Sequence, residues 1–580
     1  MSAHRASFCD LGAGRRSWED AANALRSLIM TVSSPSAVRS REESLLESRF
    51  QWFVAGLILL AATLRVPRLG TDGLWLDEAI AAQLATLPLD DFIRGLLIDT
   101  HPPLHFVLIK LVCAVIGVEA WTEAAVRSLS LVLGLASVWL IAIVGRRLVC
   151  PASGVLAAYL LAISPIHVHY SREGRGYTLL VLLILAAILV VSRVRERPTV
   201  RRAVACGVVL ALLAYTHNIA HFVLLPLVLW LAGSPSRFRE RAHRNAFLVT
   251  GFTALALYGP WLPATLGQAV QVSRTAAAGS GPIEWLAPVW KAIFPWQIPL
   301  SVTALSHGAP APVRNLVDEA TPISMVTGAL SCGLIVAGVR ARSMWSEPKG
   351  RYALLALFLL PLVLLFAASV VGTPIYSTGR VDVLALPGFV LLLAAGVNSL
   401  APRASAQTGE GSASSHARQL RPFLVASLLV GLALAAVGGI SQEIFDASGS
   451  DYRDRALVVL RPARDGDVLV ITGKERSVFA YYARRKGKHL HMLGFPRARD
   501  EHPNWLRWTE YGTGRLNREA SQVADAAYAL AARRGRIVWV QRRFRGEREL
   551  YAELARRFDM LEQKGLAAGL YLALYPRAPQ

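Results

Sequence analysis

Residues 69–106 read LGTDGLWLDEAIAAQLATLPLDDFIRGLLIDTHPPLHF and directly follow the first strongly apolar run of this 580-residue chain. Asp77 and Glu78 stand side by side in this stretch, after a tryptophan and a leucine. Asp99, His101 and two prolines follow about twenty residues later. The fold therefore depends on whether the apolar runs cross a membrane and on which side these polar groups lie.

The composition indicates a membrane protein. Hydrophobic residues make up 53% of the chain and charged residues only 18%. Apolar runs close to the length that crosses a bilayer recur from Phe50 to Ile440, which predicts a polytopic α-helical membrane protein. The net charge of +22 lies mainly in short connections between these runs. Membrane topology explains such a charge pattern, so nucleic acid is not predicted as a partner.

Arginine and lysine in short loops predict the orientation, because they favour the cytoplasmic side. They are concentrated in five connections: 145–151, 193–202, 233–245, 340–351 and 401–421. The alternating connections contain few of them and are predicted to lie outside: 67–126, 164–176, 217–221, 263–322 and 372–380. Asp77 and Glu78 are thus predicted on the outer face of a bacterial inner membrane, with a cytoplasmic amino terminus.

The apolar run 104–118 is short and has Lys110 in its middle. A lysine at the bilayer centre costs about 2.5–3.5 kcal/mol on insertion scales, so we expect an interfacial or re-entrant helix there. About eleven spans remain: 50–66, 127–145, 152–165, 177–192, 203–217, 219–232, 246–262, 323–339, 352–371, 381–400 and 422–440.

Three domains follow from this pattern. Residues 1–49 are predicted to be a disordered cytoplasmic leader, residues 50–440 a transmembrane domain with outer loops 67–126 and 263–322, and residues 441–580 an α/β domain on the outer side. In the last domain, strands are predicted at 467–473, 536–542 and 570–576, and helices at 517–535 and 549–561.

The adjacent acids Asp77 and Glu78 have two interpretations. They are solvated acids at the membrane interface, or one of them is a general base. A carboxylate that is partly desolvated beside another carboxylate has a raised proton affinity, which suits a base.

Several polar groups on the same predicted face could bind an anion. His101 could donate a hydrogen bond to an anionic oxygen, or it is incidental to a turn that starts a helix. Arg172 and Arg175 precede a helix and are suited to phosphate, although a salt bridge or snorkelling also explains them. His217 and Arg380 lie at the ends of spans, where packing is the alternative for the histidine.

No cofactor is required by the sequence. There is no P-loop, and no GxGxxG follows a predicted strand. His167 and His169 have no clear third ligand, and the five cysteines show no CxxC spacing, so neither a divalent metal nor a disulfide framework is indicated.

The order of these motifs resembles the GT-C membrane glycosyltransferases, in particular bacterial members akin to protein O-mannosyltransferases, aminoarabinose transferase and rhizobial galacturonosyltransferases. That superfamily has a W-x-D-E element in its first outer loop, then a [H/K]-P-P-L element and an arginine that enters the next span. Here "LWLDEA", "THPPLHF" and Arg127 correspond. "YSREGRGYTLL", with Tyr170, Arg175 and Tyr177, is similar to a third family segment, and "YTH" (215–217) and "GRVDVLALPG" match more loosely.

The resemblance implies an inverting transfer of a sugar from a polyprenyl-phosphate donor to a glycan, lipid or protein acceptor at the outer face. Asp77 would be the general base, and Glu78 would assist it or orient a substrate. The remaining residues implied for the donor phosphate or the substrate are His101, Arg127, Tyr170, Arg172, Arg175, Tyr177, His217 and Arg380. Two alternatives stay open, namely a lipid-linked glycan polymerase or ligase, and a non-enzymatic lipid or glycan transporter.

Overall fold

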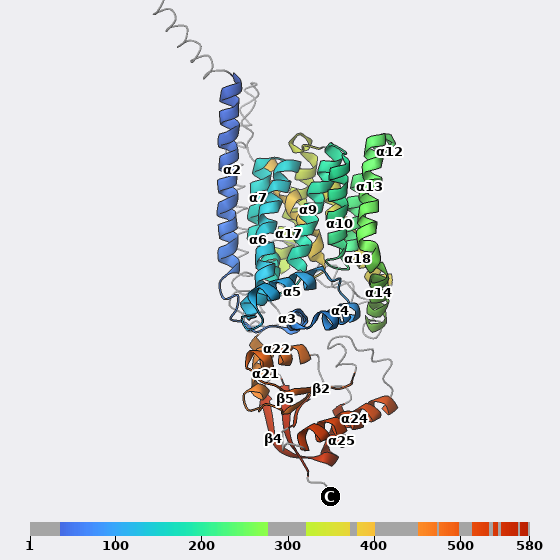
Figure 1. Ribbon diagram of the computed structural model, residues 1–580. Coiled ribbons are helices and arrows are strands. Elements are labelled where there is room, and N and C mark those ends of the chain that lie inside the picture. Colours follow the sequence, from blue (N-terminus) through green and yellow to red (C-terminus); the bar gives the residue numbers. More distant parts are fainter. Residues whose placement is uncertain are drawn as a thin grey trace, which may run out of the picture. The chain divides into compact units, whose positions relative to one another are not determined.

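The computed structural model (Figure 1) describes residues 35–276, 321–347, 349–371, 380–400, 450–471, 475–497, 513–532, 538–542, 547–566 and 569–577. The chain divides into two units, 1–56 and 57–580, and the site described below lies entirely in the second. Helix α2, Pro35–Arg65, includes the last part of the predicted leader. The predicted span 422–440 and most of the predicted loop 263–322 lie outside the described residues.

The chain is mostly helical from residue 57 to residue 400. After α2 the helices are α3 (Leu76–Thr86), α4 (Leu89–Ile98), α5 (Leu104–Ile116), α6 (Glu123–Leu148), α7 (Pro151–Ala162), α8 (Pro165–Arg172), α9 (Tyr177–Glu196), α10 (Val200–Ala214), α11 (Ala220–Ala232), α12 (Pro235–Arg239), α13 (Arg241–Tyr258), η1 (Gly259–Trp261), α14 (Leu262–Ala276), α17 (Thr321–Arg340), η4 (Arg342–Met344), α18 (Gly350–Val371), η5 (Asp382–Ala385) and α19 (Leu386–Leu400).

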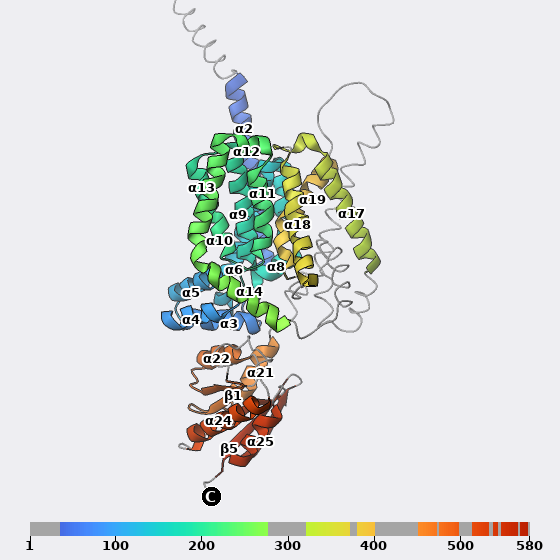
Figure 2. The same ribbon diagram turned by 90° about the vertical axis from the view of Figure 1, so that its right-hand side faces the viewer.

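Five helices in the described part of the chain are long and apolar enough to cross a membrane, or six if the bent pair α7 and α8 forms one span. Several predicted spans correspond to shorter helices, such as α11 with 13 residues. The described residues therefore show a membrane protein with several span-capable helices, and the predicted count of eleven stays a prediction. In both Figure 1 and Figure 2, α6, α9, α10 and α13 run side by side.

Close contact between α6 and α7 depends on small residues. A Cβ added to Gly154 on α7 would lie only 2.4 Å from the carbonyl oxygen of Ala142 on α6. Such a distance is well inside van der Waals contact, so any larger side chain at this position would push the two helices apart. The glycine lets their backbones touch.

Helices α3, α4 and α5 lie across one end of the long helices (Figures 1 and 2). Helix α5 has 13 residues and is about 20 Å long, too short for a span of ~30 Å. Lys110 explains this placement, because its Nζ donates to the carbonyl oxygens of Leu87 (2.5 Å) and Ala85 (3.3 Å) at the carboxyl end of α3. A cation at a helix carboxyl terminus satisfies carbonyl groups that have no partner within the helix.

The carboxyl-terminal part contains a five-stranded mixed sheet. Its strands are β1 (Val468–Ile471), β2 (His491–Gly494), β3 (Val538–Arg542), β4 (Phe558–Leu566) and β5 (Gly569–Pro576), and its helices are α21 (Ser450–Leu460), α22 (Arg476–Arg485), α24 (Thr513–Ala532) and α25 (Glu547–Arg557). The strand order is β2-β1-β3-β5-β4. Strands β2, β1 and β3 are parallel, whereas β5 is antiparallel to both β3 and β4. The three predicted strands lie in β1, β3 and β5, but residues 558–561, predicted as helix, begin strand β4.

Alternate residues of β1 enter two separate hydrophobic clusters, because successive side chains of a strand point to opposite faces. Val468 and Val470 pack with α24 and α25. Leu469 and Ile471 pack with α21 and α22, and the same cluster continues into the residues of α3 and α5. The sheet and the 67–126 loop thus share one apolar core.

Candidate active site

Asp77 and Glu78 lie in the first turn of α3, but they face different neighbours. The Glu78 side chain accepts a hydrogen bond from the backbone N–H of Trp75 at 3.3 Å, at the start of the helix. Adjacent residues on an α-helix are rotated by about 100°. The two carboxylates therefore do not act as one pair, although they are neighbours in the sequence.

Glu78 is buried and ion-paired. It is 1% exposed, and its two oxygens accept from Arg127 Nε at 2.8 Å and Nη2 at 2.7 Å. Oε1 also accepts from the backbone N–H of Gly174 at 2.7 Å. A two-point arginine–carboxylate pair of this kind is strong and directional. Glu78 is held by the fold, and these contacts indicate a structural role for it.

All the N–H groups of the Arg127 guanidinium donate hydrogen bonds to oxygen atoms of the protein. Besides Glu78, its Nη1 donates to the carbonyl oxygens of Leu69 (2.9 Å) and Asp72 (3.1 Å), and its Nη2 donates to that of Gly73 (3.0 Å). A guanidinium has five N–H groups, and these contacts occupy all five. Arg127 organises the loop that leads into α3, and these contacts do not support its implied role as a phosphate contact.

Asp77 lies between two arginines from distant parts of the chain. Its Oδ2 is 3.0 Å from Arg380 Nη2 and 3.4 Å from Arg175 Nη2. The side chains of Asp77 and Arg175 are 14% and 7% exposed, whereas that of Arg380 is 43% exposed. The cluster is therefore buried on the Arg175 side and open to solvent on the Arg380 side.

The charges around Asp77 determine its proton affinity. Burial of the carboxylate acts to raise its pKa, but the positive charges of Arg175 and Arg380 outweigh burial. The pKa of Asp77 therefore lies below its ordinary value of 3.8. The raised proton affinity predicted from the sequence is wrong, because the two arginines outweigh burial and Glu78 is paired with Arg127.

His101 joins this cluster through Arg175. Its Nε2 lies 3.4 Å from Arg175 Nη2, and its Nδ1 lies 2.9 Å from Asp99 Oδ1. A guanidinium can only donate, so Nε2 accepts and the ring proton is on Nδ1, where Asp99 accepts it. The resulting chain, Asp99–His101–Arg175–Asp77, fixes the orientation of the arginine.

Aromatic rings line the cluster. Tyr170 and Tyr177 are buried, with ring centroids 4.3 Å apart, and the Tyr177 hydroxyl accepts from Arg380 Nε at 2.8 Å. The His217 ring lies 5.5 Å from that of Tyr177 and 5.1 Å from that of His101. The segments around residues 101, 170–177, 217 and 380 thus meet at one place.

His217 contributes a hydrogen-bond donor, its Nε2–H, to the cluster around Asp77. The backbone N–H of Ile219 donates to its Nδ1 at 3.2 Å, so the ring proton is on Nε2. This Nε2 is buried, and it has no hydrogen-bond partner within the described residues. Burial and the positive charges of Arg175 and Arg380 lower the pKa of His217 well below 6.5, so the ring is a neutral donor at pH 7.

Arg172 lies elsewhere. Its Nη1 donates to the carbonyl oxygens of Arg65 (2.8 Å) and Pro67 (2.6 Å), at the carboxyl end of α2. This is the position where a basic side chain stabilises a helix end. The predicted phosphate role of Arg172 is not supported by these contacts, whereas Arg175, three residues on, is in the cluster.

Two features of the site were missed by reasoning from the sequence. Asp99 accepts from both the ring and the backbone N–H of His101, and the D-x-H spacing of a local aspartate turn was the available signal. The second missed feature is Gly174. A Cβ at this position would lie 2.8 Å from Val126 Cγ1 and would disturb the hydrogen bond from the backbone N–H of Gly174 to Glu78.

Within the described residues, no group of three His, Cys, Asp or Glu side chains is arranged to hold a metal ion.

Comparison with known proteins shows what the chain as a whole is similar to. The family model described as dolichyl-phosphate-mannose-protein mannosyltransferase matches residues 100–263. Among curated protein sequences, none matches the chain significantly.

Solved structures are similar over nearly the whole chain. ArnT from Cupriavidus metallidurans in the apo state is 13% identical, with a TM-score of 0.51 over 92% of this chain and 99% of that one. The same protein bound to undecaprenyl phosphate is 13% identical, with a TM-score of 0.52 over 90% and 97% of the two chains. The chain therefore has the fold of ArnT, and the family match over residues 100–263 supports the resemblance to the GT-C superfamily that the sequence motifs indicated.

Proposed function

We propose that this protein is an inverting glycosyltransferase that moves a sugar from a polyprenyl-phosphate donor to an acceptor hydroxyl. The observation that carries the proposal is the contact of Asp77 with both Arg175 and Arg380. A base and a phosphate-binding pair are the two groups that a single displacement at an anomeric carbon needs. The GT-C fold and the bound undecaprenyl phosphate in the ArnT structure support this choice of donor.

The proposed reaction is one displacement. The acceptor oxygen attacks the anomeric carbon and loses its proton to Asp77. At the same time, the bond from that carbon to the phosphate oxygen breaks, and its electron pair leaves with the polyprenyl phosphate. Arg175, Arg380 and the Nε2–H of His217 are placed to stabilise the charge that develops on the phosphate. Tyr177 orients Arg380 through its hydroxyl.

The same arrangement explains how a carboxylate of low proton affinity becomes a base. A donor phosphate would compete with Asp77 for Arg175 and Arg380, since arginine binds phosphate through two N–H groups. Asp77 would then lose charge compensation and gain an anionic neighbour, and both changes raise the pKa of a carboxyl group. In this proposal, donor binding activates the base.

The pH dependence tests this activation. The acid limb of kcat/KM reports groups of the free enzyme, and that of kcat reports groups of the substrate complex. Because the pKa of Asp77 lies below 3.8 without donor and should rise when the donor phosphate is bound, we expect the acid limb of kcat to lie at higher pH than that of kcat/KM. The measurement is initial-rate kinetics across pH in proteoliposomes, and coincident limbs would contradict the proposed competition.

Replacement of Arg175 by alanine should mainly impair use of the donor. We expect kcat/KM for the donor to fall by about 10²–10³-fold, the usual effect of removing one donor from an anion-stabilising site, with a much smaller change in KM for the acceptor. Arg94→Ala on α4 is the matched control, because that side chain is 77% exposed and is outside the cluster. Equal losses for donor and acceptor would exclude a specific phosphate role.

The orientation, location and domain division are part of the proposal. We place the Asp77 end of the bundle on the outer face of a bacterial inner membrane, where a lipid-linked donor would present its headgroup. The sheet of β1 to β5, which shares a core with α3, would be on the same face, within the proposed outer domain 441–580. Mass spectrometry of membrane extracts should show an accumulated polyprenyl-phosphate sugar in a deletion strain. An unchanged lipid and glycan profile in that strain would oppose the glycosyltransferase function.

A further inference from the structure

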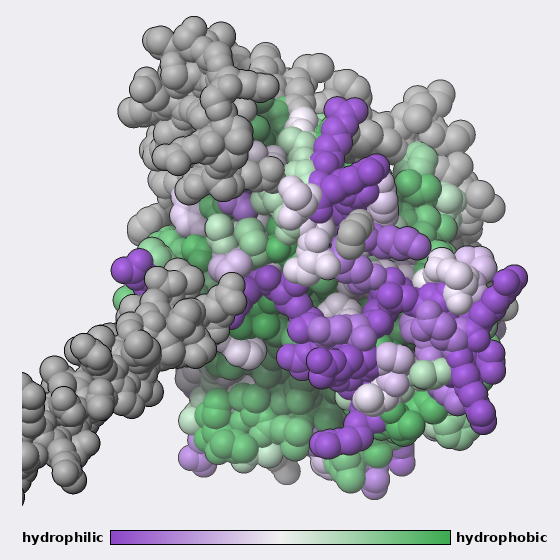
Figure 3. All heavy atoms as spheres, turned by 90° about the horizontal axis from the view of Figure 1, so that it is seen from above, coloured by the Kyte–Doolittle hydropathy of each residue, from purple (hydrophilic) through white to green (hydrophobic). Residues whose placement is uncertain are grey.

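A cavity of about 590 Å³ lies where α6 and α9 end, near α12 and the segment that follows η4. Figure 3 views this end and shows hydrophilic side chains gathered there, with hydrophobic ones around them. The cavity is separate from the Asp77 cluster, because the cluster adjoins the amino-terminal ends of α3 and α9. Its lining includes five arginines and only two glutamates: Arg146, Arg147, Arg193, Arg195, Arg237, Glu196 and Glu347.

One wall of the cavity is fixed by a buried ion pair. The Arg195 side chain is 3% exposed, and its Nε is 3.1 Å from Glu347 Oε1. Arg195 Nη1 also donates to the carbonyl oxygen of Trp230, and Arg237 Nη1 donates to the carbonyl oxygen of Arg195 at 3.0 Å. A charge buried in this way needs such partners, so the wall is built by three separate segments of the chain.

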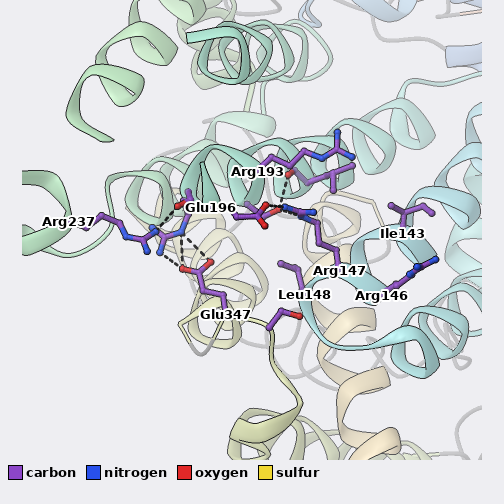
Figure 4. A pocket seen from close by; sticks show the side chains of 12 residues that line it. Ile143, Arg146, Arg147, Leu148, Arg193, Glu196, Arg237 and Glu347 are labelled. Atoms are coloured by element: carbon purple, nitrogen blue, oxygen red, sulfur yellow. Dashed lines mark hydrogen bonds and ion pairs between the residues drawn. The ribbon is translucent and has the colours of Figure 1, made fainter. Parts of the chain in front are cut away.

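The opposite wall carries a second ion pair. Arg147 Nη2 contacts Glu196, and Arg147 Nε donates to the Ser192 hydroxyl at 3.1 Å. Figure 4 shows Arg147, Glu196 and Arg193 on one side of the cavity and Arg237 and Glu347 on the other. Each glutamate is matched by one arginine, so the lining keeps a positive excess that an anion can neutralise.

The cavity also has an apolar part. Ile143, Leu148 and Leu189 line it together with the arginines. The orientation signal requires only that arginines lie in cytoplasmic loops, whereas these five line one hollow. A basic hollow between membrane helices, with an apolar wall, is the arrangement that receives lipid phosphate groups.

We propose that this cavity is a phosphate-anion site separate from the active site, with its arginines around the phosphate and its apolar wall along an attached acyl chain. A lipid with an anionic headgroup fits both parts of the lining, and a soluble phosphate fits the arginines alone. This inference does not depend on the proposed glycosyltransferase activity.

The test is native mass spectrometry of the purified full-length protein, equilibrated with phosphatidylglycerol or with phosphatidylcholine. We expect phosphatidylglycerol to be retained preferentially. The double variant R193Q/R237Q should lose about 20-fold or more of that retention, because each arginine near an anionic group contributes roughly fivefold to binding. It leaves the ion pairs of Arg147 and Arg195 intact.

The matched control is R201Q/R239Q, which removes two exposed arginines that do not line the cavity. A second arm measures the rise in Tm produced by inorganic phosphate in lipid-free detergent. If R193Q/R237Q loses its retention of phosphatidylglycerol, the result supports a lipid headgroup as the ligand. If inorganic phosphate raises the Tm of the unmodified protein but not that of R193Q/R237Q, the result supports a soluble anion. Equal losses in R193Q/R237Q and R201Q/R239Q would overturn the site. So would the combination of equal retention of phosphatidylglycerol and phosphatidylcholine with no rise in Tm from inorganic phosphate.

Discussion

Asp77→Asn is expected to lower the rate of sugar transfer by about 10²–10⁴-fold, the usual effect of removing a general base, while the protein remains folded and still binds its donor. Asparagine keeps the shape of the side chain but cannot accept the proton of the acceptor hydroxyl. The two arginines that contact Asp77 then lose a competing anion. We therefore expect donor affinity to be unchanged or higher in this variant.

The measurement combines single-turnover transfer rates with donor binding in nanodiscs. Asp91→Asn is the matched control, because this carboxylate lies on the neighbouring helix α4 and is 56% exposed. Full activity of the Asp77 variant would remove it from the mechanism. Loss of donor binding together with activity would instead assign Asp77 to the organisation of the arginines.

Glu78→Gln is expected to damage the fold rather than the chemistry. The change leaves Arg127 buried without a counter-charge, and breaking a buried pair in this way costs about 3–5 kcal/mol. We expect a large fall in Tm, measured by tryptophan fluorescence in detergent, that Asp77→Asn does not show. Arg127→Met should be similarly damaging, since it also frees three backbone carbonyl groups.

Asp77 and Glu78 are therefore expected to differ: the Asp77 variant loses transfer rate but stays folded, whereas the Glu78 variant loses stability. A Glu78→Gln protein with an unchanged Tm but no activity would show that Glu78 takes part in the reaction, against the structural role inferred from its contacts. Donor binding by the variant at low temperature, where it is still folded, separates the two possibilities further.

Much of the architecture could be predicted from the sequence because the signals were local. Lys110 within a short apolar run predicted that α5 does not span the membrane, and the order of the WLDE, HPPL and REGRGY motifs predicted the superfamily. The predicted end of the span 152–165 lies at the break between α7 and α8, which are bent by 61°, but helix α8 itself, which begins at Pro165 within the predicted connection 164–176, was not predicted. A proline disfavours helix in the residue before it, so a signal was present.

The missed parts of the site depend on contacts between distant segments. Nothing near Arg127 in the sequence shows that the carbonyl groups of residues 69–73 will occupy its N–H groups. Arg172 and Arg175 are equivalent by composition, and only the end of α2 distinguishes them. The separation of Asp77 from Glu78, in contrast, follows from helix geometry and could have been predicted once α3 was placed.

The loop that carries Asp77 is tied to the far end of the chain. The Tyr482 hydroxyl accepts from the backbone N–H of Leu74, and the Tyr481 hydroxyl donates to the carbonyl oxygen of Trp121. During synthesis the ribosome releases residues 74 and 121 long before α22 exists. A nascent chain therefore lacks these two hydrogen bonds until α22 has been made, and we expect a chain that ends before α22 to hold the backbone at residues 74 and 121 less firmly.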